Sequence, residues 1–187
     1  MVAIEQDIVK IIQEDADMMA LLKAVRSMYL PDWWICAGFV RGKIWDTLHG
    51  LKTPLPDIDV IYFDKKSMEE ERDKQLEKEL HQILSPVPWS VKNQARMHNR
   101  NHVPPYTSSE DAISKFPETA TALGVRLDQN EKVILTAPHG IKDAIQLEVR
   151  PTTYFLQTEE RMKIYRRDRV SEKNWQLIWN KVKIHYI

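Results

Sequence analysis

One segment of the chain predicts a strand, a glycine turn and a helix in direct succession: Trp33-Trp-Ile-Cys-Ala-Gly-Phe-Val-Arg-Gly-Lys-Ile-Trp-Asp-Thr-Leu-His-Gly50. Its first part, Trp33 to Ala37, is an apolar run of the length of a buried strand. Apolar residues then recur at helical spacing from Val40 to Leu48, and Gly50 can end that helix. Gly38, between the two elements, allows a tight turn and lets the backbone approach a ligand closely.

A second strand is predicted over Asp57-Ile-Asp-Val-Ile-Tyr-Phe63. Because side chains alternate across a strand, Asp57 and Asp59 share one face, and Ile58, Val60 and Tyr62 share the other. The apolar face belongs in a core, so the two carboxylates are presented side by side on the opposite face.

The remaining patterns predict further helices and strands around these two. We expect N-terminal helices over Ile4 to Val25, stopped near Pro31, and a charged helix opened by a capping box at Ser67 and Glu70. A third strand is predicted over Trp89 to Met97, followed by a loop over Asn99 to Pro117 with a short helix at Asp111 to Lys115. The chain should end with a hairpin of Val125 to Leu127 with Val133 to Thr136, and with two helices, Glu159 to Arg169 and Glu172 to Ile184. This interleaving indicates an α/β or α+β fold with a small mixed sheet and flanking helices.

Length and composition favour one ordinary globular domain. The 187 residues contain 27 Lys plus Arg and 27 Asp plus Glu, so no net charge indicates a nucleic-acid or membrane partner. We expect a single domain over 1–187, with N-terminal helices in 1–31, a catalytic-type core in 33–137 and basic helices in 158–187. We expect a cytoplasmic protein with no membrane partner. The reasons are the single cysteine, Cys36, the lack of a long apolar run, and the acidic Glu5 and Asp7 near the start.

The aspartate pair is the sharpest chemical feature. Two carboxylates at this spacing repel each other unless a cation lies between them or solvent screens them. Mg²⁺ accepts one or two protein carboxylates and completes its octahedron with water and phosphate oxygens. The alternative for Asp57 and Asp59 is an exposed strand face with two solvated side chains, which is common.

The glycine turn upstream strengthens the first interpretation. The helix after Gly38 points its free N–H groups at the turn, where they can bind phosphate, and Arg41 in its first turn can add a bidentate contact. The alternative is a tight turn with Arg41 serving solubility. Either feature alone is weak evidence, but their order and spacing together favour a phosphate and metal site.

These residues resemble a known signature. Ala37 to Gly50 followed by Asp57-Ile-Asp-Val60 is similar to the G-G-x-V-R-D…G…D-x-D pattern of tRNA CCA-adding enzymes and poly(A) polymerases. Across most of its length the chain resembles a bacterial family of stand-alone nucleotidyltransferase-like proteins, including the stretches Trp89 to His98, Phe116 to Ala122 and Ala137 to Gly140. The resemblance implies a polymerase-β-like nucleotidyltransferase head domain. It places Mg²⁺ on Asp57 and Asp59, and the phosphates of an NTP at Gly38, Phe39 and Arg41.

The chain departs from that signature at three points. Ala37 replaces the first glycine, and Gly42 replaces the aspartate. The superfamily usually has a third carboxylate on the following strand, where this chain offers the amides Asn93 and Gln94. The resemblance therefore implies either an enzyme that transfers a nucleotidyl group to an unknown acceptor hydroxyl, or a weak or inactive nucleotide-binding module.

Other candidates carry less weight. His98 and His102 lack a third ligand for zinc, and Cys36 fits a buried inert thiol. The C-terminal helices are basic and carry Trp175 and Trp179; the cations are Arg161, Lys163, Arg166, Arg167, Arg169, Lys173, Lys181 and Lys183. They fit an RNA acceptor or an RNA-binding accessory protein, or else a solvated cationic face over a packed tryptophan stripe, which we favour.

Overall fold

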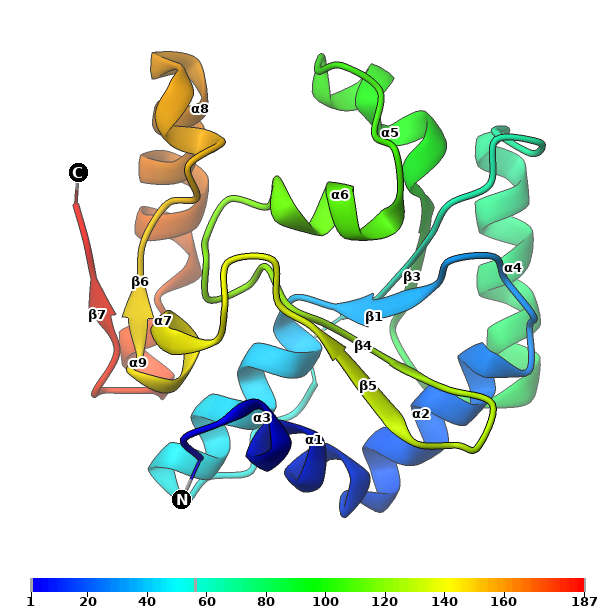
Figure 1. The fold of residues 1–187 in the computed structure, drawn as a ribbon, viewed down its shortest axis with the longest axis horizontal. Helices are drawn as coiled ribbons and strands as arrows, with labels where there is room; N and C mark the ends of the chain where they lie inside the picture. Colours follow the sequence, from blue (N-terminus) through cyan, green and yellow to red (C-terminus); the bar gives the residue numbers. More distant parts are fainter. Residues whose placement is uncertain (1, 56, 187) are drawn as a thin grey trace.

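The computed structural model describes residues 2–55 and 57–186 and is built around a five-stranded mixed sheet (Figure 1). Its strands are β1 (Trp34–Cys36), β2 (Ile58–Tyr62), β3 (Trp89–Asn93), β4 (Gly124–Leu127) and β5 (Val133–Thr136), in the order β3-β2-β1-β4-β5. Only β2 and β3 pair in parallel; the other neighbours are antiparallel. The register aligns Cys36 with Asp59 and Asp59 with Ser90.

Four helices cover one face of the sheet. They are α1 (Glu5–Gln13), α2 (Ala16–Arg26), α3 (Gly38–His49) and α4 (Glu70–Ile83). Ile35, Val60 and Val91 of the central strands pack against them in the main core. The predicted N-terminal helices, the strand–turn–helix succession and the hairpin are confirmed, and Gly50 ends α3 in the left-handed conformation at φ 65°.

The opposite face carries Asp59 and is covered more sparsely. Trp34, Cys36 and Ile61 on this face pack against Ile113 of α6 (Ser109–Ser114) in a small second cluster. Figure 1 shows α6 and α5 (Gln94–Asn101) above this face, with α8 (Glu159–Ile164) beside them. The alternation of β2 is as predicted, because Ile58, Val60 and Tyr62 lie in the main core.

Two predictions in the middle of the chain are wrong. The α4 helix begins at Glu70 after the N-cap residue Glu69, with no side-chain cap, so the expected capping box does not form. The strand predicted over Trp89 to Met97 ends at Asn93, because the Asn93 side chain accepts a hydrogen bond from the backbone N–H of Ala95 and caps α5.

The C-terminal region is less helical than the sequence predicts. The segment begins as α8 (Glu159–Ile164), continues as a π-helix, η2 (Tyr165–Ser171), and has only a short α9 (Trp175–Ile178). A left-handed residue, Asn174 at φ 48°, precedes α9, and the chain then forms β7 (Lys183–Ile184). The predicted helix Glu172 to Ile184 is therefore wrong.

The β7 strand pairs in parallel with β6 (Glu148–Val149). Neither β6 nor α7 (Lys142–Ile145) nor η1 (Phe155–Gln157) is among the elements expected from the sequence. No helix in the described ranges 2–55 and 57–186 is long and apolar enough to cross a membrane.

Candidate active site

Asp59 lies at the floor of a hollow of about 260 Å³ on the sparsely covered face of the sheet. We define this candidate cleft by its lining residues: Cys36, Ala37, Asp59, Val60, Ile61, Ser90, Lys92, Gln94, Met97, Asn101, Phe116, Pro117, Thr121 and Arg169. Besides the strands, four parts of the chain line the cleft around Asp59: the β1–α3 turn, α5, the segment 116–121 and the π-helix η2. The cleft thus joins the predicted aspartate strand to the predicted glycine turn.

The two aspartates differ in their surroundings. Asp57 is exposed just before β2, whereas Asp59 is partly buried within it. Burial, followed by the charge of Asp57, raises the pKa of the Asp59 carboxyl, and the positive charges of Arg169, Lys173 and Lys92 oppose that rise. A buried carboxylate beside a second negative charge is stabilised by a bound cation. The oxygen donors present here are those that Mg²⁺ prefers.

The turn before α3 places its unusual backbone conformation at Ala37, not at Gly38. Ala37 is the N-cap residue at φ 56° and ψ −117°, close to the first central position of a type II′ turn, which glycine normally occupies. Gly38 is the first residue of the helix. Arg41 N–H bonds to Ala37 O at 3.0 Å, so the preceding N–H groups have no acceptor within the helix.

The side chain of Phe39 is fully buried in the main core. Only its backbone N–H is therefore placed at the helix N-terminus, beside that of Gly38.

Arg41 is also buried, inside a cage of indole rings. Its guanidinium carbon lies 5.0 Å from the ring centroids of Trp45 and Trp175 and 5.8 Å from that of Trp179. Burial lowers the pKa of Arg41 to about 10, with the charge of Glu118 opposing the shift, so the side chain stays charged at neutral pH. Its Nε has no hydrogen-bond partner among the residues that the structure describes.

Gly38 and Arg41 line a different hollow, of about 460 Å³, along the flank of α3. The structure therefore brings Ala37 and Asp59 together, but Gly38, Arg41 and Asp57 are not among the residues that line the candidate cleft.

Asn93 does not face the candidate cleft. It is fully buried on the core face of the sheet, where it pairs with Tyr62 across the strands. Its Oδ1 accepts from Asp64 N and Ala95 N, and its Nδ2 donates to Asp64 O and Ser67 O, so all its hydrogen-bonding capacity is used.

The β3 side chains that do line the cleft are Ser90 and Lys92, with Gln94 just beyond the strand. Gln94 is also buried. Among residues 2–55 and 57–186, no group of three or more His, Cys, Asp or Glu side chains could hold a metal ion.

No sequence pattern placed several of the cleft residues beside Asp59. Lys92, Thr121 and Arg169 are 33, 62 and 110 positions after Asp59 along the chain and reach it only through the sheet register and the C-terminal fold. Thr121 belongs to the stretch Phe116 to Ala122, which the family resemblance singled out without giving it a role.

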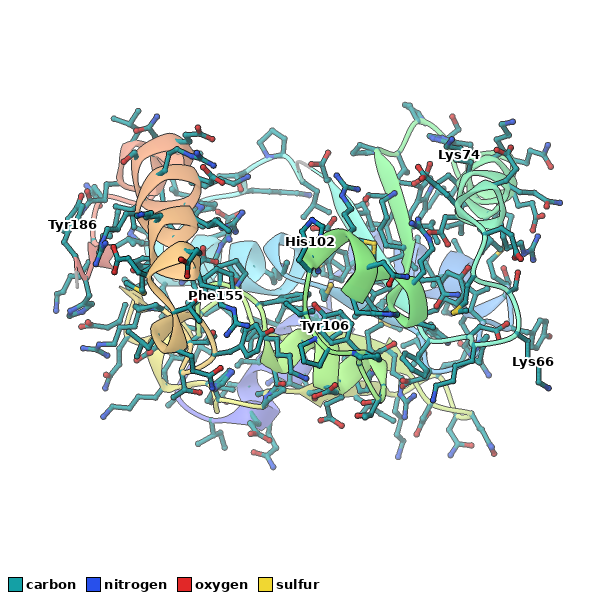
Figure 2. The ribbon with its side chains drawn as sticks, turned by 90° about the horizontal axis from the view of Figure 1, so that it is seen from above. Lys66, Lys74, His102, Tyr106, Phe155 and Tyr186 are labelled. Atoms are coloured by element: carbon teal, nitrogen blue, oxygen red, sulfur yellow. The ribbon has the colours of Figure 1, made fainter. Side chains whose placement is uncertain are left out.

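The lesser candidates fall outside the cleft or are inert. Cys36 is buried, and burial raises the pKa of its thiol. His102, the C-cap residue of α5, lies exposed and is labelled in the view from above (Figure 2). Many C-terminal cations are held by acids: Arg166 pairs with Glu159 and Arg167 with Asp168.

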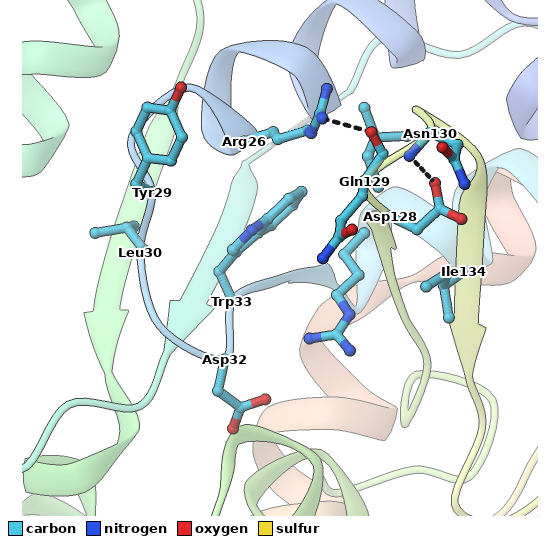
Figure 3. Close-up of a pocket in the computed structure, with 11 residues that line it drawn as sticks. Arg26, Tyr29, Leu30, Asp32, Trp33, Asp128, Gln129, Asn130 and Ile134 are labelled. Carbon is cyan, nitrogen blue, oxygen red and sulfur yellow. Dashed lines mark hydrogen bonds between the residues drawn. The ribbon is translucent and has the colours of Figure 1, made fainter.

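A larger hollow, of about 660 Å³, lies where the β4–β5 turn meets the segment between α2 and β1 (Figure 3). Arg26 and Asp128 line it but are already engaged: Arg26 donates to Gln129 O at 3.0 Å, and Asp128 accepts from Asn130 N at 2.8 Å. This hollow contains neither Asp59 nor Ala37.

Comparison with known proteins identifies the family. The profile of a family described as "Nucleotidyltransferase" matches residues 23–184. The chain belongs to this nucleotidyltransferase family. A solved structure described as "The NMR structure of the protein reveals a CCA-adding enzyme head domain" is 41% identical, with a TM-score of 0.88, over 98% of this chain and 96% of the other.

More distant structures share the fold of this nucleotidyltransferase. A CCA-adding enzyme complexed with CTP gives a TM-score of 0.60 at 12% identity, covering 98% of this chain and 44% of that one. The Thermotoga maritima CCA-adding enzyme complexed with tRNA gives 0.57 at 14% identity, covering 98% and 43%. The chain thus spans less than half the length of these two enzymes. No curated protein shows a significant match.

Proposed function

We propose that this protein is a Mg²⁺-dependent nucleotidyltransferase that moves a nucleotidyl group from an NTP to an acceptor hydroxyl and releases pyrophosphate. The observation that carries the proposal is the candidate cleft, where Asp59 lies beside the N-terminus of α3 within a nucleotidyltransferase family fold. The acceptor is open, and RNA is one candidate. The single cysteine supports a reducing, cytoplasmic setting.

Each part of the site has a distinct task in this proposal. Asp57 and Asp59 would hold Mg²⁺, which neutralises triphosphate charge and lowers the pKa of the acceptor hydroxyl when bound. The backbone N–H groups of Gly38 and Phe39 donate to phosphate oxygens, aided by the helix dipole. The guanidinium of Arg41 in α3 is surrounded by indole rings, so it does not contact the phosphates. Arg41 favours their binding only through its buried positive charge.

One observation favours a second candidate, a nucleotide-binding module with weak turnover. The cleft side chains on and after β3 are Ser90, Lys92 and Gln94, none of which can supply a third carboxylate. A protein of this kind binds MgNTP through Asp57 and Asp59 but transfers the nucleotidyl group slowly.

Mg²⁺-dependent thermal stabilisation by NTP tests binding. With ligand tenfold above its Kd, linkage gives about 1.4 kcal/mol, or roughly 3–6 °C in Tm for a domain of this size. The double variant Asp57→Asn, Asp59→Asn should lose the metal-dependent part of the shift. Glu160→Gln, which removes an exposed carboxylate on α8, should keep it. No shift with any NTP at millimolar nucleotide and Mg²⁺ would refute the proposal.

Transfer is tested separately. Each NTP, labelled at the α-phosphate, is incubated with Mg²⁺ and with cell-derived RNA, protein or metabolite fractions. Labelled product supports the enzyme, whereas binding without product from any fraction supports the weak or inactive module.

A further inference from the structure

Arg169 reaches the candidate cleft from a part of the chain far from both predicted motifs. It lies in the π-helix η2 and lines the same hollow as Asp59 and Ala37. Its positive charge also opposes the rise in the pKa of Asp59, which agrees with its position close to that carboxyl. Arg169 is therefore placed where an anion bound in the cleft would meet it.

The side chain is held in a defined orientation by Glu118. Glu118 is fully buried and accepts hydrogen bonds from Arg169 Nε and Nη2 and from Thr121 Oγ1, the last at 2.6 Å. A guanidinium has five N–H donors, and this side-on pairing uses two of them. Within residues 2–55 and 57–186 the Nη1 group makes no hydrogen bond, so both of its donors are available to another acceptor.

The second cation of the cleft is engaged elsewhere. Lys92 Nζ lies 3.2 Å from Glu77 Oε1 of α4 and 3.0 Å from Val91 O of the edge strand β3, which leaves one of its three ammonium donors. Among the cleft residues of the described chain, Arg169 is thus the cation with more donors left, three against one for Lys92.

A buried ion pair is weak evidence for stability, because removing two charges from water costs about as much as their attraction returns. The Glu118–Arg169 pair makes better sense as a device that orients one guanidinium toward the cleft. It also gives a role to the stretch Phe116 to Ala122, which contributes both Glu118 and Thr121.

We infer that Arg169 binds the pyrophosphate portion of the NTP and that Glu118 is its positioning residue. This inference rests on the proposed function. In the transfer, the acceptor oxygen bonds to the α-phosphorus and the bond from that phosphorus to the α–β bridging oxygen breaks. The acceptor proton passes to solvent, and the departing pyrophosphate gains the negative charge that Arg169 offsets.

Inorganic pyrophosphate is the probe, measured by calorimetric titration of the full chain with and without Mg²⁺. Arg169→Gln should weaken binding about tenfold or more, since a hydrogen bond between charged groups is lost. Arg169→Lys, which keeps the charge next to Glu118 but lacks the guanidinium fork, should also bind weakly while remaining folded. Arg167→Gln, an exposed neighbour in η2 paired with Asp168, should bind as wild type does.

Glu118 is tested through its partner. Glu118→Gln should weaken pyrophosphate binding in the wild-type background and have little further effect in the Arg169→Gln background. A merely structural role would lower the Tm equally in both backgrounds and leave pyrophosphate affinity unchanged in each folded variant. Nucleoside monophosphate affinity should not change in any of these variants, because the β- and γ-phosphates are missing.

The outcomes separate the two proposals. Wild-type protein that binds neither pyrophosphate nor NTP, with or without Mg²⁺, overturns the proposed function and this inference with it. The inference alone is overturned if wild-type protein binds pyrophosphate and Asp59→Asn weakens that binding, but folded Arg169→Lys and Arg169→Gln bind pyrophosphate as wild type does.

Discussion

Replacing Asn93 with aspartate gives a sharp test of how the third strand is used. If Asn93 occupied the place of a missing metal ligand, Asn93→Asp would raise transfer. The structure predicts the reverse, because Nδ2 donates to Asp64 O and to Ser67 O at 2.7 Å each. A carboxylate cannot donate either bond and would face two carbonyl oxygens in a buried position.

The expected loss follows from these two contacts. An unsatisfied buried polar group costs about 1–3 kcal/mol, so two orphaned carbonyls cost about 2–6 kcal/mol. Urea unfolding followed by tryptophan fluorescence measures the loss, and single-turnover pyrophosphate release measures transfer. Gln94→Glu is the matched control, since Gln94 lines the cleft and its amide makes only one long bond, 3.3 Å to Lys92 O. An Asn93→Asp variant as stable as wild type, with tenfold faster transfer, would refute this reasoning.

Three further changes test other parts of the structure. Ala37→Gly should raise the free energy of unfolding by roughly 1 kcal/mol in a urea titration, because glycine adopts φ 56° without strain; a less stable variant would contradict the assigned turn. Asp59→Asn should be more stable than wild type at pH 7 without metal, because folding raises the pKa of the Asp59 carboxyl, so its contribution to stability is present below the unfolded value of 3.8 and is lost as pH rises through the folded pKa. A pH series of unfolding curves should show that the difference in stability between the two proteins vanishes in acid. His185→Gln should destabilise the protein at neutral pH, because the hydrogen bond from His185 is the largest cause of the lowered pKa of Glu148, whose contribution to stability is present above the unfolded value of 4.5 and is lost as pH falls through the folded pKa. Equal unfolding curves for both proteins at neutral pH would argue against the contact.

The strand, turn and helix from Trp33 to Gly50 could be predicted because each depends on local chemistry. An apolar run, a helical period and a terminal glycine each act within a few residues. The two aspartates could be placed on one face because alternation in β2 is fixed by its apolar partners in the core.

The rest depends on contacts that distant residues make. Asn93 ends β3 by capping α5, and the N-cap preference of asparagine was a signal available in the sequence. Trp175 and Trp179 have helical spacing, but they surround Arg41, and nothing local predicts that cage. The sequence alone could not distinguish an Arg41 that contacts phosphate from an Arg41 that is buried, because the answer depends on where those indoles lie.

The tryptophan cage also imposes an order on the maturation of the protein. Trp179 Nε1 donates to Asp46 of α3 at 2.8 Å across 133 positions of sequence. Synthesis runs from the N-terminus, so a ribosome-bound chain already contains α3 with Trp45 and both aspartates while Trp175, Trp179 and Arg169 are still to be made. During that interval Arg41 is hydrated and the cleft lacks one wall. The two sides of the site therefore mature together, and only after translation has passed Trp179.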